Sequence, residues 1–255
     1  MIEALHTDKL TIGYNGKALL PPIDVSMKQG DVVAIAGPNG AGKTTLFKTL
    51  SANLKPLKGG IAYFGKPLSK YTQSQRSSLF SLVLTEKPDD LFIKVFDIVA
   101  AGRYPHLGLM ANLKEEDEKI IVESLETAGI ADLIDRNFVS LSDGEKQKVM
   151  IAKALVQDTP IIFMDEPAAF LDYPSKIELM SLMLKLSREK QKTILFSSHD
   201  LDLLLRYSDM MWVVAHGMPL IAGKPYELVQ DGTIDAYFKP IKAKEQFFWL
   251  NDIKH

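Results

Sequence analysis

The stretch that decides the fold is Gly37-Pro-Asn-Gly-Ala-Gly42-Lys43-Thr44. It matches the pattern G-x-x-x-x-G-K-[ST], in which glycines let a loop curl so that backbone N–H groups point at phosphate oxygens. The Lys43 amine can reach the β- and γ-phosphates, and the Thr44 hydroxyl can hold Mg²⁺. The apolar run Val32–Ala36 precedes the loop, and a helical pattern from Lys43 to about Leu54 follows it. This context favours a nucleoside triphosphate site over a chance glycine turn, because the helix adds its positive N-terminus.

Two further apolar runs, Ile161–Met164 and residues 193–196, have no alternation and are typical of strands buried on both faces. Longer helical patterns separate these runs, which predicts an α/β fold with a parallel sheet covered by helices. Each run is followed at once by polar or glycine-rich residues. Ligands of such sheets gather beyond the carboxyl ends of the strands, so we expect one shared site there.

The polar residues that follow the two later runs are an acid pair and a histidine. Asp165 is placed to hold Mg²⁺, and Glu166 can orient or deprotonate an attacking water. Both could instead cap the next helix, since acidic residues favour helix N-termini. His199 ends the third run, and we expect it to contact the γ-phosphate rather than to be purely structural. Asp200 is an equally good helix cap for the residues after it.

The rest of the chain divides into recognisable segments. Residues 5–14 and 18–27 carry β-formers around an Asn15-Gly16 turn, which predicts a hairpin. Residues 88–158 are mostly helical; one helix is expected to start at Asn112 with Glu115 as its third-position acid, and its apolar face contains Ile120, Ile121 and Leu125. A second hairpin is expected to turn near residues 216–217. We expect the tail, with Phe247, Phe248 and Trp249, to pack against the core.

The composition excludes several classes of protein. The 255 residues include 46% apolar and 24% charged residues, an ordinary globular composition. The net charge is −2, which argues against a basic nucleic-acid surface. The chain has no cysteine, so disulfides and thiol catalysis are excluded. The longest apolar run, residues 210–215, is far shorter than the roughly 20 residues that span a bilayer, and no signal peptide is visible. We therefore expect no membrane-crossing segment.

Five motifs follow one another along the chain: the phosphate loop, Leu141-Ser-Asp-Gly-Glu145, the run IIFMDEP, Phe170-Leu-Asp172 and Ser198-His-Asp200. In this order they resemble the motifs of the ATP-binding subunit of ABC transporters. The likeness extends from about residue 5 to 229. The L-S-x-G-[QE] segment discriminates this family from P-loop kinases and GTPases, and the chain also lacks the guanine-reading N-K-x-D stretch.

The resemblance implies a P-loop NTPase (RecA-like) core of about residues 1–87 and 159–255, with an N-terminal antiparallel β subdomain and a helical subdomain of about residues 88–158. The whole chain would be one ABC ATPase domain. The implied ATP-binding residues are Tyr14, which would stack on adenine, and Gly37, Pro38, Asn39, Gly40, Ala41, Gly42, Lys43, Thr44 and Thr45. A half-buried hairpin aromatic is the alternative for Tyr14.

The same resemblance implies a head-to-tail dimer with two ATP molecules between the copies. Ser142, Gly144 and Glu145 would contact the ATP held by the other copy, and Asp172 would lie at the interface. The residues agree with this use, because Ser142 and Glu145 form a capping-box pattern at the start of a helix whose N-terminus attracts anions. Catalysis would involve Glu166 and His199, and Mg²⁺ would be held by Thr44 and Asp165.

Two departures from the family pattern stand out. Position 143 is Asp where the family usually has Gly, and we expect its carboxylate to point away from phosphate because like charges repel. The family also has a Gln about forty residues after the lysine, and the matching stretch here reads Leu82-Val-Leu-Thr-Glu-Lys87. Either Thr85 or Glu86 takes that place, and Glu86 could bind Mg²⁺.

The stretch Ala100-Ala-Gly-Arg-Tyr-Pro-His106 resembles a stretch found in importers of ferric siderophores, haem and cobalamin. The alternative is an ordinary loop of the helical subdomain. The hypothesis is an ATPase on the cytoplasmic face of the inner membrane that drives import of a metal chelate, most readily an iron siderophore. Its partners would be a second copy, a separate permease and, indirectly, a substrate-binding protein, with no nucleic acid. The alternatives are a soluble non-transport ABC ATPase and a nucleotide-binding regulatory module with little turnover.

Overall fold

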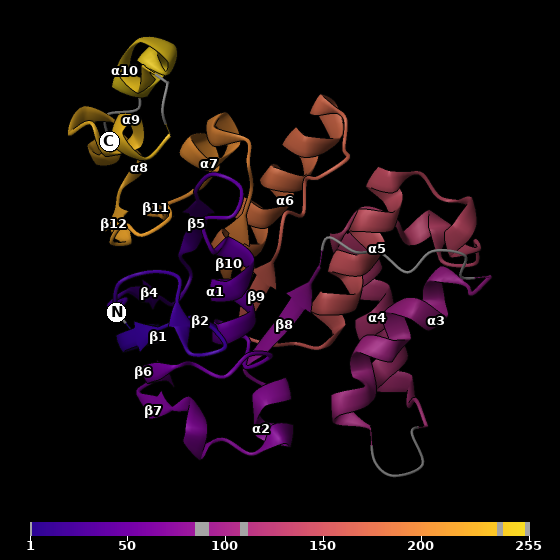
Figure 1. The fold of residues 1–255 in the computed structure, drawn as a ribbon. Helices are drawn as coiled ribbons and strands as arrows, with labels where there is room; N and C mark the ends of the chain where they lie inside the picture. Colours follow the sequence, from indigo (N-terminus) through magenta and orange to yellow (C-terminus); the bar gives the residue numbers. More distant parts are fainter. Residues whose placement is uncertain (1, 85–91, 108–111, 239–241, 253–255) are drawn as a thin grey trace.

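The computed structural model describes residues 2–84, 92–107, 112–238 and 242–252, and its core is a twisted sheet with helices on both faces (Figure 1). Within these residues the sheet has six strands, which in spatial order are β12 (Ile221–Gly223), β11 (Met210–Val213), β5 (Val32–Ala36), β10 (Thr193–Ser197), β9 (Ile161–Met164) and β8 (Phe80–Val83). All neighbouring pairs are parallel except β11 with β12. The expected α/β fold with a parallel sheet is thereby confirmed.

The three apolar runs form the three central strands, as the sequence predicts. Every residue of β5, β9 and β10 is buried, because each face of the sheet is covered by a different set of side chains. Val32, Ala34 and Ala36 belong to one hydrophobic cluster, whereas Val33 and Ile35 belong to the other. β10 extends one residue beyond the apolar run to the polar Ser197.

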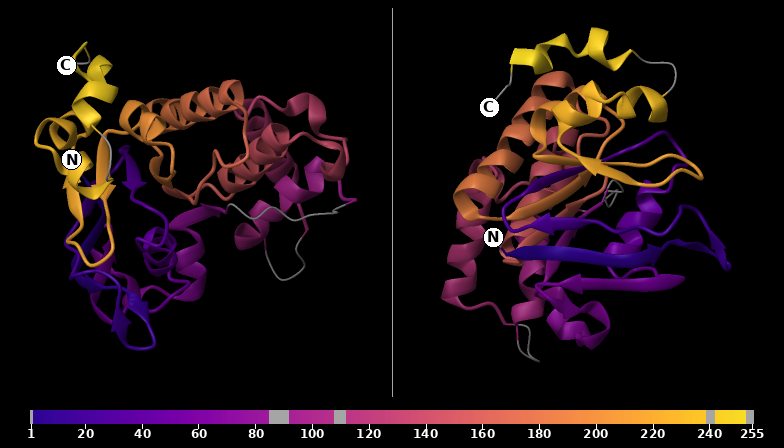
Figure 2. Two further views of the ribbon diagram at one scale, coloured as in Figure 1. Left: turned by 45° about the horizontal axis from the view of Figure 1, so that its top comes forward. Right: turned by 90° about the vertical axis from the view of Figure 1, so that its left-hand side faces the viewer.

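A second, antiparallel sheet lies beside the first (Figure 2). Its strands, in spatial order, are β4 (Ser26–Lys28), β1 (Glu3–Thr11), β6 (Lys58–Tyr63) and β7 (Lys66–Pro67). The expected pairing around Asn15-Gly16 is confirmed: β1 pairs with β4, and the turn itself joins β2 (Gly13–Tyr14) to β3 (Lys17–Ala18). Asn15 and Gly16 both have positive φ, as the tight hairpin turn requires.

Seven helices of the described residues belong to these layers or to the C-terminal segment. They are α1 (Lys43–Leu50), α2 (Gln73–Ser77), α6 (Tyr173–Lys190), α7 (Leu201–Tyr207), α8 (Pro225–Gln230), α9 (Thr233–Tyr237) and α10 (Ala243–Gln246). The expected extent of the first helix to Leu54 is wrong. α1 ends at Leu50 because Ala52 adopts a left-handed conformation with φ 60°, which a continuing helix cannot contain.

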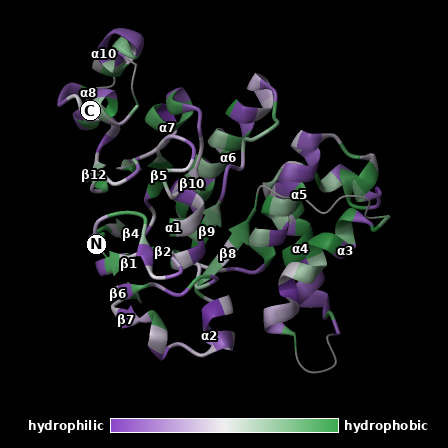
Figure 3. Cartoon of the chain, in the orientation of Figure 1, coloured by the Kyte–Doolittle hydropathy of each residue, from purple (hydrophilic) through white to green (hydrophobic). Residues whose placement is uncertain are grey.

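Between β8 and β9 the chain forms a separate group of helices, on the side of the molecule away from the C-terminal helices (Figures 1 and 2). The group contains α3 (Val95–Ala100), the 3₁₀ helix η2 (Ala101–His106), α4 (Glu115–Thr127) and α5 (Asp143–Val156). It has its own hydrophobic cluster, to which Ile121 and Leu125 belong and against which Ile120 packs, as expected. Figure 3 shows hydrophobic residues along α3.

The expected start of α4 at Asn112 is wrong. The helix begins at Glu115 with Lys114 as its N-cap, since the Asp117 carboxylate accepts a hydrogen bond of 3.0 Å from the Lys114 backbone N–H. An acid three residues after the cap satisfies one of the amide groups that have no partner within the helix. The sequence therefore predicts the correct pattern, a cap with an acid three residues later, but places it two residues too early.

The C-terminal segment packs on the core only in part. The hairpin of β11 and β12 turns at Gly217, which has φ 69°, as predicted. Phe247 is 5% exposed and Trp249 packs on the same cluster, with the Arg206 guanidinium 3.6 Å from the Trp249 ring centroid. The expectation for Phe248 is wrong, because its side chain is 68% exposed. Among the described residues, no helix has the length and apolar character that crossing a membrane requires.

Candidate nucleotide-binding and catalytic site

The phosphate loop joins β5 to α1 and surrounds a cavity of about 220 Å³. The cavity is lined by Leu19, Asn39, Gly40, Ala41, Gly42, Lys43, Thr44, Thr45 and Glu166. Gly40 and Gly42 have φ values of 78° and 101°, which residues with a Cβ rarely adopt. Gly42 is also the N-cap of α1, so the helix N-terminus opens into the same cavity.

Gly37 shows why the loop leaves the sheet as it does. A Cβ at this position would lie 2.4 Å from the backbone oxygen of Val214, the residue that follows β11. Only glycine allows such a close approach between the end of β5 and the neighbouring chain. Packing against the sheet therefore requires glycine at the first residue of the loop, while the positive φ values of Gly40 and Gly42 let the loop bend.

The Lys43 side chain is 6% exposed and lies along the loop. Its Nζ donates hydrogen bonds to the backbone oxygens of Gly37, at 2.7 Å, and Pro38, at 3.3 Å. Burial lowers the pKa of Lys43, and the negative charges of Glu166 and Asp165 act in the opposite direction. Lys43 thus brings a desolvated cation to the loop, where an anionic phosphate would find few competing water molecules.

Tyr14 and Thr45 connect the β2–β3 hairpin to the phosphate loop. The Thr45 hydroxyl donates to the Tyr14 hydroxyl at 3.3 Å, while the Tyr14 side chain is 45% exposed. A half-exposed aromatic ring thus lies beside the loop. The position suits the adenine contact that the sequence suggests, which stays a prediction.

The two carboxylates follow β9 directly. Asp165 accepts a hydrogen bond of 2.7 Å from the Ser197 hydroxyl, and the Glu166 backbone N–H donates to the same hydroxyl at 2.9 Å. Glu166 has φ 47°, a conformation that costs free energy in a residue with a Cβ and is frequent at functional sites. Ser197 is not among the site residues expected from the sequence, although a polar residue that ends an otherwise apolar strand is a visible signal.

His199 lies at the same edge of the sheet. Its Nδ1 is 3.5 Å from Oε2 of Glu166, and its side chain is 61% exposed. Asp200 is the N-cap of α7, where its carboxylate accepts from the Leu203 backbone N–H at 3.5 Å, and it also pairs with Lys176 at 3.3 Å. The expected helix cap at Asp200 is thereby confirmed.

Ser142, Gly144 and Glu145 lie at the start of α5. The capping box predicted from the sequence is present: the Ser142 backbone N–H and hydroxyl both donate to Oε2 of Glu145, at 2.7 and 2.8 Å, and the Glu145 backbone N–H donates to the Ser142 hydroxyl at 3.3 Å. The hydrogen bonds from Ser142 lower the pKa of Glu145. This part of the chain does not line the cavity at the phosphate loop.

Asp172 is the N-cap of α6, the next long helix. Its carboxylate accepts from the Ser175 backbone N–H at 3.1 Å, and the hydrogen bonds from Ser175 lower the pKa of Asp172. A Cβ on Gly144 would lie 3.3 Å from the Ser175 hydroxyl oxygen, so the N-termini of α5 and α6 are neighbours. Phe170 and Tyr173, on either side of this cap, are 82% and 64% exposed.

The site residues expected from the sequence thus form two groups. One group surrounds the phosphate loop and contains Tyr14, residues 37–45, Asp165, Glu166 and His199. The other group contains Ser142, Gly144, Glu145 and Asp172, at the starts of α5 and α6. The third expected metal ligand, Glu86, and its alternative Thr85 lie outside the described residues.

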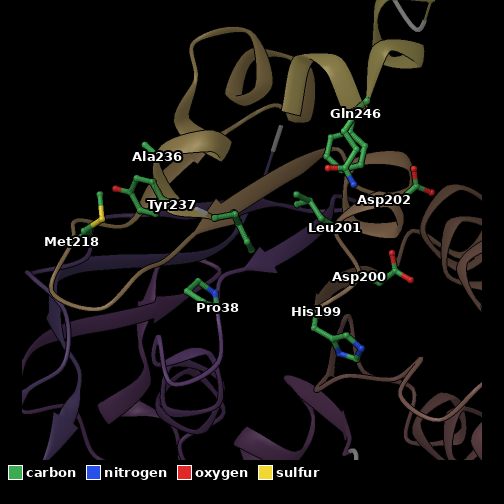
Figure 4. Close-up of a pocket in the computed structure, with 11 residues that line it drawn as sticks. Pro38, His199, Asp200, Leu201, Asp202, Met218, Ala236, Tyr237 and Gln246 are labelled. Carbon is green, nitrogen blue, oxygen red and sulfur yellow. The ribbon is translucent and has the colours of Figure 1, made fainter. Parts of the chain in front are cut away.

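A larger cavity of about 690 Å³ adjoins the first group (Figure 4). Pro38 and His199 lie on one side of it, and Tyr237 and Gln246 from the C-terminal helices lie on the other. The Tyr237 hydroxyl donates to the Pro219 backbone oxygen at 2.6 Å. The C-terminal segment therefore approaches the edge of the nucleotide site without entering the phosphate loop.

A family model described as ABC transporter matches residues 20–169. The chain belongs to the ABC transporter family. It is 38% identical over 226 residues to an uncharacterized ABC transporter ATP-binding protein of Methanocaldococcus jannaschii, covering 89% of this chain and 78% of that protein. It is also 32% identical to the ferric enterobactin transport ATP-binding protein FepC of Escherichia coli, covering 93% of this chain and 88% of FepC.

Solved structures of ABC ATP-binding cassettes have the same fold. The structure of cbiO1 from Clostridium perfringens, part of the ABC transporter complex cbiONQ, superposes with a TM-score of 0.81 at 28% identity and covers 99% of both chains. The ADP conformation of another ABC cassette superposes with a TM-score of 0.83 at 25% identity, covering 94% of this chain and all of that one. The chain is an ABC ATPase that binds ATP and couples its hydrolysis to transport.

The importer-like stretch of this ABC subunit is largely occupied by structural contacts. Arg103 forms an ion pair of 2.9 Å with Asp117, both side chains being 9% exposed, and also donates to the Val156 backbone oxygen at 2.9 Å. A ring nitrogen of His106 lies 2.8 Å from the backbone oxygen of Gln157. Arg103 and His106 thus hold the C-terminal end of α5, and Tyr104 between them is 64% exposed.

Proposed function

We propose that this ABC ATPase powers the import of a metal chelate, most readily an iron siderophore, through a separate membrane permease. The observation that carries the catalytic part is the convergence of Lys43, Asp165, Glu166 and His199 on one phosphate loop. The import part rests on relatives. Besides FepC, the chain is 32% identical to the achromobactin transport ATP-binding protein CbrD of Dickeya dadantii over 93% of its length.

The residues of the first group divide the chemical work. Backbone N–H groups of the loop and the Lys43 amine bind the β- and γ-phosphates. Glu166 accepts a proton from the attacking water, and His199 contacts the γ-phosphate and keeps the Glu166 carboxylate in place. Tyr14 stacks on the adenine. No covalent intermediate with the protein is needed, because positioning and electrostatic stabilisation provide most of the catalysis in phosphoryl transfer.

The donor set fits Mg²⁺. Thr44 and Asp165 would hold the ion, which would neutralise charge on the phosphate oxygens. Mg²⁺ is ordinarily bound by one or two protein ligands together with substrate phosphates and water, so a hydroxyl and a single carboxylate suffice. Ser197 donates to Oδ1 of Asp165, and such a hydrogen bond would orient the carboxylate as an oxygen ligand.

A second copy would complete the site. Ser142, Gly144 and Glu145 belong to the second group of residues, so in a head-to-tail dimer they would meet the ATP bound by the other copy. The capped N-terminus of α5 favours an anion at that place. The exposed Phe170 and Tyr173 beside Asp172 are aromatic residues of the kind that is enriched in protein interfaces.

The relatives are transport ATP-binding proteins, and we therefore infer a place on the cytoplasmic face of the inner membrane, bound to the permease. A substrate-binding protein would act on the permease and not on this chain. Because the ATPase would not touch the chelate, its own residues carry no information about the chelate's chemistry.

The test is to co-purify the chain with its permease and to screen chelates for stimulated ATP hydrolysis. We expect an iron siderophore to stimulate hydrolysis. Stimulation by haem or cobalamin instead would identify that compound as the substrate in place of a siderophore. Rapid hydrolysis by the isolated chain, together with failure to co-purify any membrane partner, would favour a soluble non-transport ATPase. ATP binding without turnover in the assembled complex would favour a regulatory module.

A further inference from the structure

Ser197 occupies a place between the two carboxylate residues of the site. It is the last residue of β10, is fully buried, and lies on the strand next to β9. In the parallel register Phe196 pairs with Met164, so Ser197 stands beside Asp165 at the point where β9 ends. The side chain thus reaches the catalytic edge from the neighbouring strand.

The directions of its two hydrogen bonds are fixed by chemistry. The Glu166 backbone N–H can only donate, and it does so to the Ser197 oxygen at 2.9 Å. The hydroxyl then has one proton to give, and Asp165 Oδ1 accepts it at 2.7 Å. One side chain therefore holds the backbone of Glu166 and the carboxylate of Asp165 at the same time.

The Glu166 backbone needs such support. With φ 47° it occupies the left-handed region, which persists in a residue with a Cβ only where the surroundings hold it. On the other side, the backbone oxygen of Glu166 accepts from the Ala169 N–H at 3.0 Å. Ser197 and Ala169 thus hold the two ends of the residue, and the direction of the Glu166 side chain depends on both.

We propose that Ser197 is a positioning residue of the ATPase reaction, which couples the metal ligand Asp165 to the base Glu166. The proposal rests on the roles given to these two residues in the proposed function. A purely structural serine would only satisfy a buried N–H group. A positioning serine also orients a ligand of the metal. Mutation of a residue that hydrogen-bonds to a metal ligand typically lowers metal affinity or activity by roughly 10–100-fold.

The test uses three substitutions of one position in the full chain. Ser197→Thr keeps the hydroxyl, whereas Ser197→Val has nearly the same shape as Thr without it, and Ser197→Ala removes it with the least added volume. Thr159→Val is the control. Thr159 is also buried, and its hydroxyl donates to the Ile161 backbone oxygen at 2.9 Å, at the opposite end of β9 from the site.

Two readouts are needed, kcat and metal affinity. The second is Mn²⁺ binding in the presence of a non-hydrolysable ATP analogue, followed by electron paramagnetic resonance. We expect Ser197→Val and Ser197→Ala to weaken Mn²⁺ binding and to lower kcat by roughly 10-fold or more each, with little change in KM for ATP. Ser197→Thr should recover most of both, and Thr159→Val should change neither.

The proposal is overturned if the Val and Ala variants bind Mn²⁺ as the unsubstituted chain does, or if Thr fails to restore binding that Val has lost while all variants remain folded by circular dichroism. Failure of the catalytic part of the proposed function looks different. In that case the unsubstituted chain would hydrolyse no ATP even in the assembled complex, and the Mn²⁺ measurement would still decide whether Ser197 orients Asp165.

Discussion

Oε2 of Glu166 lies 3.5 Å from Nδ1 of His199, and the two residues follow adjacent parallel strands, β9 and β10. The Glu166 side chain is 28% exposed and the His199 side chain 61% exposed, so both are accessible to a nucleotide and to water. A carboxylate and an imidazole therefore lie side by side at the edge of the sheet. Substituting each residue in turn separates their contributions.

Substitution Glu166→Gln should leave ATP binding intact and reduce ATP turnover by roughly 10²–10⁴-fold, because the proposed general base is lost while the phosphate loop is unchanged. The variant should also accumulate as a dimer when ATP is added, which light scattering can measure. Glu189→Gln, an exposed position on α6, is the matched control and should behave like the unsubstituted chain. A variant that stays monomeric with ATP would refute the head-to-tail dimer with ATP between the copies.

Substitution His199→Ala should reduce kcat by about 10²–10³-fold, the range found when one transition-state donor is removed. KM for ATP should change much less, because the loop and Lys43 still bind the phosphates. His216→Ala, in the exposed turn between β11 and β12, is the control. Equal kinetic effects of the two substitutions would remove His199 from the reaction.

The carboxylate of Glu145 should titrate below the ordinary Glu range, because hydrogen bonds from Ser142 lower its pKa. A folded-state pKa below the unfolded value stabilises the chain above the unfolded pKa, and this contribution is lost as the pH falls through the folded pKa. NMR titration should show Glu145 ionised where exposed glutamates are already protonated. Ser142→Ala should move the pKa back up; an unchanged titration would mean that the capping box is not the cause.

Substitution Arg103→Met should lower the free energy of unfolding by about 3 kcal/mol, because the buried Asp117 carboxylate loses its ion-pair partner and keeps only the hydrogen bond from the Lys114 backbone N–H. Urea denaturation measures this change. The double variant Arg103→Met with Asp117→Leu should recover only part of the loss, since no uncompensated charge remains but the Lys114 backbone N–H at the start of α4 loses its acceptor. Lys119→Met breaks the exposed Lys119–Glu115 pair and is the control, with little expected change. Equal decreases in the free energy of unfolding for Arg103→Met and Lys119→Met would contradict the stabilising role given to the buried pair.

Strong local patterns made much of the fold predictable. The unbroken apolar runs identified β5, β9 and β10, and the glycine pattern identified the loop between β5 and α1. The sequence places the start of α4 two residues too early, because two registers offer an acid three residues after a cap, Asn112 with Glu115 and Lys114 with Asp117, and only the folded chain decides between them. The end of α1 depends on the backbone of Ala52, which no residue pattern reveals.

The chemistry of the site was predictable where it resides in a motif and not where it depends on strand pairing. Lys43 and the pair Asp165-Glu166 are visible in the sequence. Ser197 acquires its role only through the register of β10 beside β9, and Arg103 only because Asp117 lies next to it in space. The sequence marks Ser197 only as a polar residue at the end of an apolar strand, and neither pairing can be read from the sequence because it depends on how the chain folds.

The position of β5 in the sheet has a consequence for biosynthesis. Both of its neighbours, β10 and β11, come from the last quarter of the chain. On the ribosome, the strand that leads into the phosphate loop is made early and waits for partners that emerge late, and such long-range pairing is slow because the chain must first close a long loop. Until then its edges are open to wrong pairing. Nucleotide binding should therefore begin only after residue 213 has left the ribosome, when β5 can pair with both of its neighbours.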